Sequence, residues 1–220
     1  RTEKRPIPSG YSSPNHALTF GLLICASGIG LVTFLSHKEA GMITAFSAFF
    51  YVFIYTMLLK RRTPHNIVIG GLAGSTPPAI GWVAASGQTE AILPWLMVLI
   101  IFMWTPPHFW SLTLSKRKDY GEAGVPMLPV VKGEDVTRNH IAAYTTSLIA
   151  TTLIISFYGN TGVFFLITGM LLSGYFTYCA FSLRKTKSEN DAWNLFKFSN
   201  IYLYSLFICL VIDSAYLIEL

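Results

Sequence analysis

The sequence predicts an all-α, polytopic transmembrane helical bundle with seven spans, built as a single integral membrane domain over residues 1–220. Only 12% of the residues are charged, well below the roughly 25% that is usual in soluble domains, and the mean hydropathy is +0.50. Seven separate stretches each offer roughly the 20 apolar residues that a helix needs to cross a bilayer. The polar segments between them are too short for a soluble domain.

The spans differ in character along the chain. The first two are uniformly apolar, and the second ends at a basic triplet that begins at Lys60. The third is rich in glycine and contains Pro77-Pro78, the fourth contains Pro106-Pro107 and His108, and the last three are long apolar stretches. We expect the seven spans at residues 17–36, 40–59, 67–86, 91–113, 139–158, 162–183 and 197–218.

Positive charge gathers on one side of this predicted bundle. If the spans alternate in direction, fifteen Lys and Arg residues fall on one side and only Lys38 on the other. The asymmetry places the basic side in the cytoplasm, or in the matrix of an organelle, with the first residue of the chain inside and the last outside. The net charge of +5 is then explained by topology, and no nucleic acid partner is expected. The fifteen are Arg1, Lys4, Arg5, Lys60, Arg61, Arg62, Lys116, Arg117, Lys118, Lys132, Arg138, Arg184, Lys185, Lys187 and Lys197.

The fourth span contains two features that are unfavourable in a membrane helix, a proline pair and a histidine, in the segment "FMWTPPHFWSL". A proline inside a helix removes a backbone hydrogen bond, and an imidazole in hydrocarbon is also unfavourable. On a helix, a mostly polar stripe runs from Trp104 through His108 and the serines at 111 and 115 toward Asp119. The opposite face carries Phe109, Trp110 and Leu114, suited to lipid or to apolar packing. His108 is therefore a candidate ligand for a buried substrate, and the alternative is a histidine satisfied by a neighbouring helix.

Both proline pairs predict a break in a membrane helix, which is tolerated where the freed carbonyls face protein or a water-filled cavity. The third span also holds Gly70 and Gly74 at the spacing that lets two helices approach closely. We expect a central cavity lined by the third and fourth spans and open to the cytoplasmic side.

Two expected cytoplasmic loops contain more charged and polar residues than a short connector requires. Residues 58–71 join a basic cluster to His65 and Asn66, and residues 114–138 join three adjacent cations to Asp119 and Glu122. Such cations can also be explained without a substrate, because basic residues at the ends of membrane helices set their orientation and bind lipid headgroups. Together with a carboxylate they also suit an anionic diphosphate, which Mg²⁺ binds together with one or two carboxylates.

Three segments carry a resemblance to a known family: "LKRRTPHNIVIGGLAGSTPPAIGW", "WTPPHFWSL" and "KRKDYGEAGVPMLPVVKGE". They resemble the signature segments of the heme O synthases, a family of membrane-embedded UbiA-type prenyltransferases, and the resemblance covers essentially the whole chain. It implies transfer of a farnesyl group from farnesyl diphosphate to a vinyl group of heme B, with hydration, in the presence of Mg²⁺. It also implies nine helices in the family, so this chain would lack the first two and the first Asp-rich metal motif.

The resemblance assigns roles to individual residues. Asp119 is the expected metal ligand, with Glu122 ranked below it because the family's second acid would fall at Ala123. His108 is expected to bind heme, as an iron ligand, through a propionate, or through water in the final hydration. The residues expected to act on the diphosphate are Lys118, Arg61, Lys60, Asn66, Lys116, Arg117, Arg1 and Arg5, of which Lys118 and Arg61 are also expected to act in catalysis.

Other functions fit parts of the pattern. A prenyltransferase for a quinone or chlorophyllide-like acceptor is the sister interpretation, and a membrane transporter with broken helices is the alternative from another class. The family resemblance also implies a bacterial cell inner membrane, with the mitochondrial inner membrane as the alternative. Heme A synthase or terminal oxidase assembly would be further partners. Cys25, Cys179 and Cys209 lie in different spans without metal-site spacing, and we interpret them as packing residues.

Overall fold

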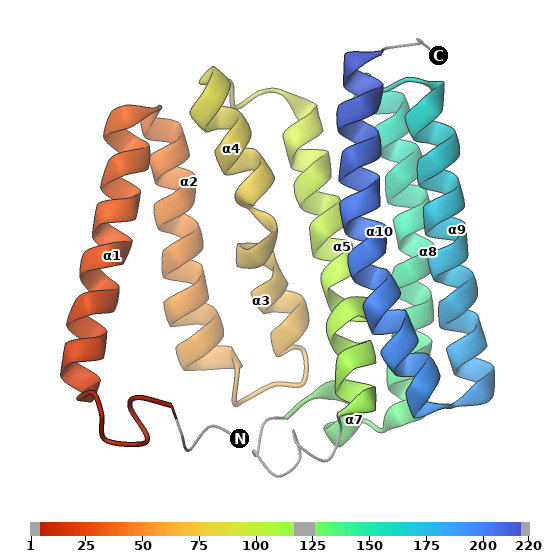
Figure 1. The fold of residues 1–220 in the computed structure, drawn as a ribbon, viewed down its shortest axis with the longest axis horizontal. Coiled ribbons are helices and arrows are strands. Elements are labelled where there is room, and N and C mark those ends of the chain that lie inside the picture. The colour runs from red at the N-terminus through yellow and green to blue at the C-terminus, as the bar shows by residue number, and fades with distance from the viewer. Residues whose placement is uncertain (1–4, 117–125, 217–220) are drawn as a thin grey trace.

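The computed structural model describes residues 5–116 and 126–216, and every regular element within them is a helix (Figure 1). Seven helices or helix pairs are long and apolar enough to cross a membrane, which confirms the predicted seven-span, all-α architecture. The elements are α1 (Pro14–Leu35), α2 (Lys38–Phe49), η1 (Phe50–Leu59), α3 (Asn66–Ser75), α4 (Pro77–Ser86), α5 (Ile92–Ser115), α7 (Leu128–Val131), α8 (Glu134–Tyr158), α9 (Val163–Thr186) and α10 (Glu189–Ala215).

Two helices begin earlier than their apolar stretches. α8 starts at Glu134, where Glu134 and Asp135 place negative charge in the first turn, and α10 starts at Glu189. At α10 the hydroxyl of Ser188 accepts hydrogen bonds from the backbone N–H groups of Asn190 and Asp191. Such a cap stabilises a helix start whatever the hydropathy of the following turn. Most of the expected connector at residues 183–197 is therefore helix.

The bundle has a densely packed half and a looser half. α5, α8, α9 and α10 contact one another closely and supply the hydrophobic core, with Trp110, Ile141, Phe176 and Leu206 all buried (Figure 1). α1 and α2 form an outer hairpin, and α3 and α4 connect it to α5. α1 has no buried residue, as expected for a helix whose apolar side chains face lipid.

The densely packed half also contains a polar contact among three helices. The hydroxyl of Ser173 on α9 lies 2.9 Å from Thr152 Oγ1 on α8 and 3.2 Å from Tyr202 Oη on α10. All three side chains are buried. Because lipid offers no hydrogen-bond partner, hydroxyls of this kind join membrane helices by bonding to one another.

One carboxylate, Asp213 on α10, caps the start of α9. Its Oδ2 accepts the backbone N–H of Gly162 at 2.6 Å, and its Oδ1 accepts the N–H of Phe165 at 2.9 Å. Asp213 is only 3% exposed, so these N–H groups have no ready access to solvent. A negative charge at a helix N-terminus is also stabilised by the helix dipole.

Replacement of Asp213 by Ala is expected to lower the free energy of unfolding by about 1–3 kcal/mol, because two buried donors lose their acceptor. Asp213→Asn keeps one acceptor oxygen and should lose less. The measurement is thermal unfolding in detergent, with Ser214→Ala as the control because its exposed hydroxyl bonds only to its own helix. A melting temperature for Asp213→Ala equal to that of the control would contradict the capping role.

The segments that carry the basic residues lie at one end of the bundle. Figure 1 shows the first described residues, the η1–α3 connection, α7 and the α9–α10 connection at its lower end, and the α4–α5 and α8–α9 connections at the upper end. Among the described residues, Lys38 is the cation at the start of a helix on the upper side. The separation of charge expected from the alternating spans is therefore present in the fold.

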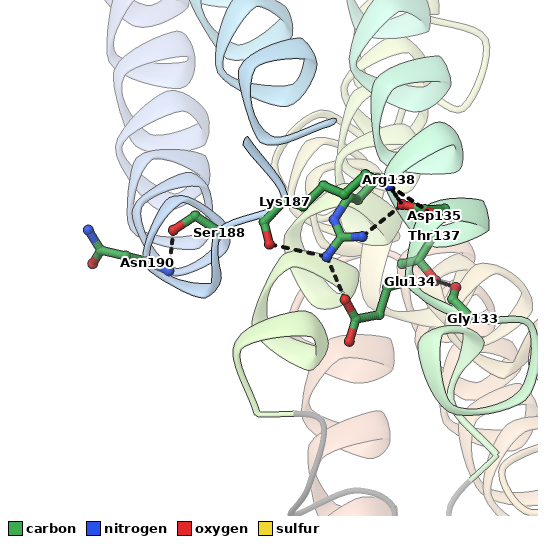
Figure 2. Close-up of polar contacts among 8 residues, drawn as sticks. All are labelled: Gly133, Glu134, Asp135, Thr137, Arg138, Lys187, Ser188 and Asn190. Carbon is green, nitrogen blue, oxygen red and sulfur yellow. Dashed lines mark hydrogen bonds and ion pairs between the residues drawn. The ribbon is translucent and has the colours of Figure 1, made fainter. Parts of the chain in front are cut away.

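Arg138 joins the start of α8 to the α9–α10 connection at the lower end of the bundle. Its guanidinium donates to Glu134 and, at 3.0 Å, to Asp135 in the first turn of α8, and Figure 2 shows it reaching the carbonyl of Lys187. Lys187 Nζ in turn bonds Asp135 Oδ2 at 2.9 Å. The Arg138 side chain is 7% exposed, so its charge is matched rather than solvated. These contacts fix the start of α8 against the α9–α10 connection.

Candidate functional site

A cavity of about 250 Å³ lies between η1, α3 and α5. This volume is just below the range of about 300–1,000 Å³ typical of small-molecule sites. Most of its lining is apolar or aromatic, as a hydrocarbon ligand requires. The lining residues are Tyr51 and Tyr55 from η1, Ile67, Gly70, Gly71 and Gly74 from α3, and Ile101, Trp104, Thr105 and Phe109 from α5.

The wall from η1 has unusual backbone geometry. η1 is a π-helix, with hydrogen bonds of the i→i−5 kind such as Lys60 N–H to Tyr55 O at 2.8 Å. π-helical turns are rare and frequently occur at functional sites. Here the π-helix carries the two tyrosines that line the cavity. Nothing in the hydropathy pattern distinguishes this segment from an ordinary span.

The sequence predicted that Gly70 and Gly74 would let another helix approach α3 closely. In the structure, Gly70 and Gly71 have this role and Gly74 does not. The ring of Tyr55 packs on Gly70, where a Cβ would lie 2.3 Å from Tyr55 Cδ2. Gly71 faces Thr105 of α5, where a Cβ would lie 3.1 Å from Thr105 Cγ2. A Cβ at Gly74 would meet no atom within 4 Å. Gly70 and Gly71 therefore allow close approach, whereas Gly74 borders open space in the cavity.

The two proline pairs have different consequences. Pro77 and Pro78 end α3 and begin α4, with Thr76 between the helices, as predicted. Pro106 and Pro107 lie inside α5, which continues unbroken through them, so the expected second break is wrong. Both are buried in the closely packed half, where neighbouring helices hold α5 in one piece despite two missing donors.

The stripe on α5 is present in its upper part and faces α10. His108 Nδ1 lies 2.7 Å from Ser199 Oγ, and Trp104 Nε1 donates to the Ser199 carbonyl oxygen at 2.7 Å. The rings of Trp104 and His108 stack, with centroids 4.2 Å apart. Trp104 also lines the cavity, whereas His108 is not among the lining residues. The alternative of a histidine satisfied by a neighbouring helix is thus realised at Nδ1.

The lower part of the stripe makes no connected polar path among the described residues. Ser111 Oγ donates to the His108 carbonyl at 2.8 Å, and Ser115 Oγ donates to the Leu112 carbonyl at 2.9 Å. Both hydroxyls are therefore used within α5. On the opposite face, which was expected to meet lipid or apolar side chains, Trp110 is buried in the core and Phe109 lines the cavity.

The loop before α3 is organised by Asn66. This residue is 1% exposed, and its Nδ2 donates to the carbonyls of Thr63 at 2.7 Å and Lys60 at 3.4 Å. Lys60 and Arg61 are exposed at the surface of the same loop. Asn66 thus shapes the segment that presents these two cations.

Lys116, at the end of α5, points toward α10. Its Nζ lies 5.9 Å from the centroid of the Trp193 ring, within the range of a cation–π contact. Arg5 is exposed at the same end of the molecule. The remaining candidates, Arg1, Arg117, Lys118, Asp119 and Glu122, lie outside the described residues.

Within residues 5–116 and 126–216, no group of three or more His, Cys, Asp or Glu side chains could hold a metal ion. Cys25, Cys179 and Cys209 are free thiols. Asp119 and Glu122, the expected metal ligands, lie outside the residues covered by this statement.

Sequence reasoning missed Ser199 and the two tyrosines of η1. Ser199 lies 91 positions after His108 and belongs to no motif, so nothing local indicates the contact. Tyr51 and Tyr55 are four residues apart, a spacing that suggests a shared face, but their role depends on the neighbouring glycines of α3.

The chain is similar in sequence to known membrane prenyltransferases. Residues 1–204 match the family model described as the UbiA prenyltransferase family. The chain is 44% identical over 220 residues to protoheme IX farnesyltransferase from Ectopseudomonas mendocina (strain ymp), covering 100% of this chain and 73% of that protein. It is 44% identical over 213 residues to the protein of the same name from Azotobacter vinelandii, covering 97% and 71%.

A solved structure supports the fold independently. It comes from a study of the biosynthesis of digeranylgeranylglyceryl phosphate synthase in membranes, and it aligns with a TM-score of 0.80 over 97% of this chain and 75% of that chain. The sequence identity is 17%, so this likeness concerns the fold alone.

Proposed function

The chain belongs to the UbiA prenyltransferase family, and we propose that it transfers the farnesyl group of farnesyl diphosphate to a vinyl group of protoheme IX, giving heme O and diphosphate. The observation that carries the proposal is 44% identity, over the whole chain, to proteins named protoheme IX farnesyltransferase. The chain is a multi-pass membrane protein, so both apolar substrates can be met within the bilayer.

The proposed reaction forms one carbon–carbon bond and adds one water molecule. The bond between farnesyl C1 and the diphosphate oxygen breaks, and C1 bonds to the terminal carbon of the vinyl group. The inner vinyl carbon is left electron-deficient and takes the oxygen of water, which then releases a proton. The products are the hydroxyethylfarnesyl side chain of heme O, diphosphate and that proton.

Departure of diphosphate requires positive charge at the cytoplasmic end of the bundle. We assign this role to Lys60 and Arg61, whose loop is held by Asn66, with Lys116 and Arg5 at the same end. Arg1, Arg117 and Lys118 complete the set in the sequence. Fixed cations of this kind stabilise charge as it develops on the leaving group.

Mg²⁺ would neutralise further charge on the diphosphate when bound, and Asp119 with Glu122 would hold it. These carboxylates follow directly on the cations at 116–118 in the sequence, so metal and cations would act on the same phosphates.

The cavity between η1, α3 and α5 suits the farnesyl chain. Its lining is mainly apolar and aromatic, and it reaches Ile67 and Phe109, which lie in the cytoplasmic halves of α3 and α5 in the proposed orientation. A chain placed there would have its diphosphate toward the 60–66 loop. The heme contact is assigned to His108, which lies between Trp104 and α10.

The proposed location is a bacterial cell inner membrane, with the basic end of the bundle cytoplasmic. Heme A synthase and the assembly of terminal oxidases are the proposed users of the product. A quinone-type or chlorophyllide-like acceptor and solute transport are the competing functions that an assay must separate.

The purified protein in detergent, given Mg²⁺, farnesyl diphosphate and heme B, is expected to form heme O, detected by chromatography and mass. Arg61→Gln should reduce the rate about 10²–10³-fold, as expected for loss of one preorganised charge. Lys38→Gln, at the opposite end of the bundle, is the control. Prenylation of a quinone precursor without heme O would favour the sister function, and solute transport without prenyl transfer would contradict the enzyme.

A further inference from the structure

The ring of His108 is held by one residue of the last helix. Ser199 on α10 is 0% exposed and contacts α5 through both of its oxygens. Its carbonyl accepts from Trp104 Nε1, and its hydroxyl oxygen lies 2.7 Å from His108 Nδ1. Phe196, one turn earlier on α10, packs against the imidazole with centroids 4.8 Å apart. The imidazole is therefore fixed in orientation between Trp104 and α10.

The number of available hydrogens favours one direction for the bond between Ser199 and His108. Ser199 has one hydroxyl proton, which it can donate either to the Phe196 carbonyl at 2.6 Å or to an unprotonated His108 Nδ1 at 2.7 Å. The carbonyl can only accept, so both contacts are hydrogen bonds only if the hydroxyl donates to Phe196 and accepts from a protonated Nδ1 of His108. The membrane interior disfavours a charged imidazolium. In the neutral ring, Nε2 therefore has a lone pair and no proton.

We propose that Ser199 is a positioning residue that holds His108 in the Nδ1–H form and keeps Nε2 as a base for the acceptor side of the reaction. The proposal rests on the proposed function. An unprotonated Nε2 can ligate heme iron or accept the proton released when water adds to the inner vinyl carbon. In this form Nε2 cannot donate to a propionate, so the proposal assigns His108 to the iron or to water.

In many histidines that bind metals, the two ring nitrogens also have different roles. One ring nitrogen donates to a neighbouring oxygen, which fixes the tautomer, and the other nitrogen acts as the ligand. Loss of such a supporting contact typically costs about 10- to 100-fold in affinity or activity. We expect a loss of this size when the hydroxyl of Ser199 is removed.

The direct test is ¹⁵N NMR of the protein labelled at histidine, with His108→Gln to assign the signals. The wild type is expected to show protonated Nδ1 and unprotonated Nε2 for His108. Ser199→Ala should shift this pattern toward the other tautomer, and Ser199→Thr, which keeps a hydroxyl, should restore it. Ser173→Ala removes an equally buried hydroxyl on α9 and should leave the His108 signals unchanged. A protonated Nε2 in the wild type would overturn the proposal.

Two further measurements connect the tautomer to the reaction. Ser199→Ala should lower heme O formation about 10- to 100-fold, and Ser199→Thr should recover most of it. A changed Soret band of bound heme in Ser199→Ala would assign Nε2 to the iron, and an unchanged band with a lower rate would assign it to water. Wild-type rate and tautomer in Ser199→Ala would refute the proposal. A protein with the expected tautomer that makes no heme O would refute the proposed function alone.

Discussion

Replacement of Asp119 by Asn is expected to reduce the rate of heme O formation by about 10²–10³-fold or more, because the diphosphate would lose the carboxylate that holds its metal. The change preserves the size of the side chain and removes only its charge. Binding of heme B, followed by its Soret band, should stay close to that of the wild type, since the heme contacts are assigned to His108. The effect should therefore fall on turnover and on the dependence of the rate on Mg²⁺ concentration.

The matched control for Asp119→Asn is Glu189→Gln. Glu189 is an exposed carboxylate in the first turn of α10, at the same end of the bundle, and its replacement changes the net charge equally. Its rate should remain within about twofold of the wild type, as expected for a surface charge away from a site. If Asp119→Asn turned over as fast as this control, Asp119 would have no part in metal binding.

The spans could be predicted from the sequence because hydropathy and length are properties of single segments. A helix in lipid satisfies its own backbone, so an apolar stretch of sufficient length has few other conformations available. The gathering of basic residues at one end follows from the alternation of these spans. The start of α10 was misjudged, because its Ser188 cap stabilises a polar turn that hydropathy assigns to a loop.

The effect of the prolines could not be predicted from their presence alone. Pro77-Pro78 separates α3 from α4, whereas Pro106-Pro107 leaves α5 continuous. The difference lies in the surroundings, since α5 is enclosed by α8 and α10 and α3–α4 lies toward the looser half. The strength of a helix-breaking signal is therefore set by packing that the local sequence does not contain.

The site was predicted only in part, for a related reason. His108 stood out because a titratable group in an apolar span is rare. Ser199 did not, because a serine in a membrane helix is common and its partner is 91 residues away. Helix periodicity placed Phe109 on a face suited to lipid or to apolar packing, but it lines the cavity because α3 and η1 lie on that side of α5. Periodicity gives the faces of a helix and does not give their neighbours.

The cavity gives the second large expected effect, through Gly74. This glycine lines the cavity, and a Cβ there would meet no atom within 4 Å, so a larger side chain can enter without moving the backbone. Gly74→Phe is expected to occupy the space proposed for part of the farnesyl chain. At about 0.8 kcal/mol for each buried CH₂, exclusion of one five-carbon unit would cost up to about 4 kcal/mol. The kcat/KM for farnesyl diphosphate should then fall by up to about 10³-fold.

The chain length of the donor separates this effect from general damage. Geranyl diphosphate is one isoprene unit shorter, so Gly74→Phe should lose much less activity with it and should prefer it over farnesyl diphosphate. Gly81→Phe is the matched control, because Gly81 lies in the same span, a Cβ there also meets no atom within 4 Å, and it is not among the cavity residues. Equal loss with both donors would indicate misfolding of the variant. Unchanged kcat/KM with both would place the farnesyl chain elsewhere, because a phenyl ring in its path cannot leave its binding unaffected.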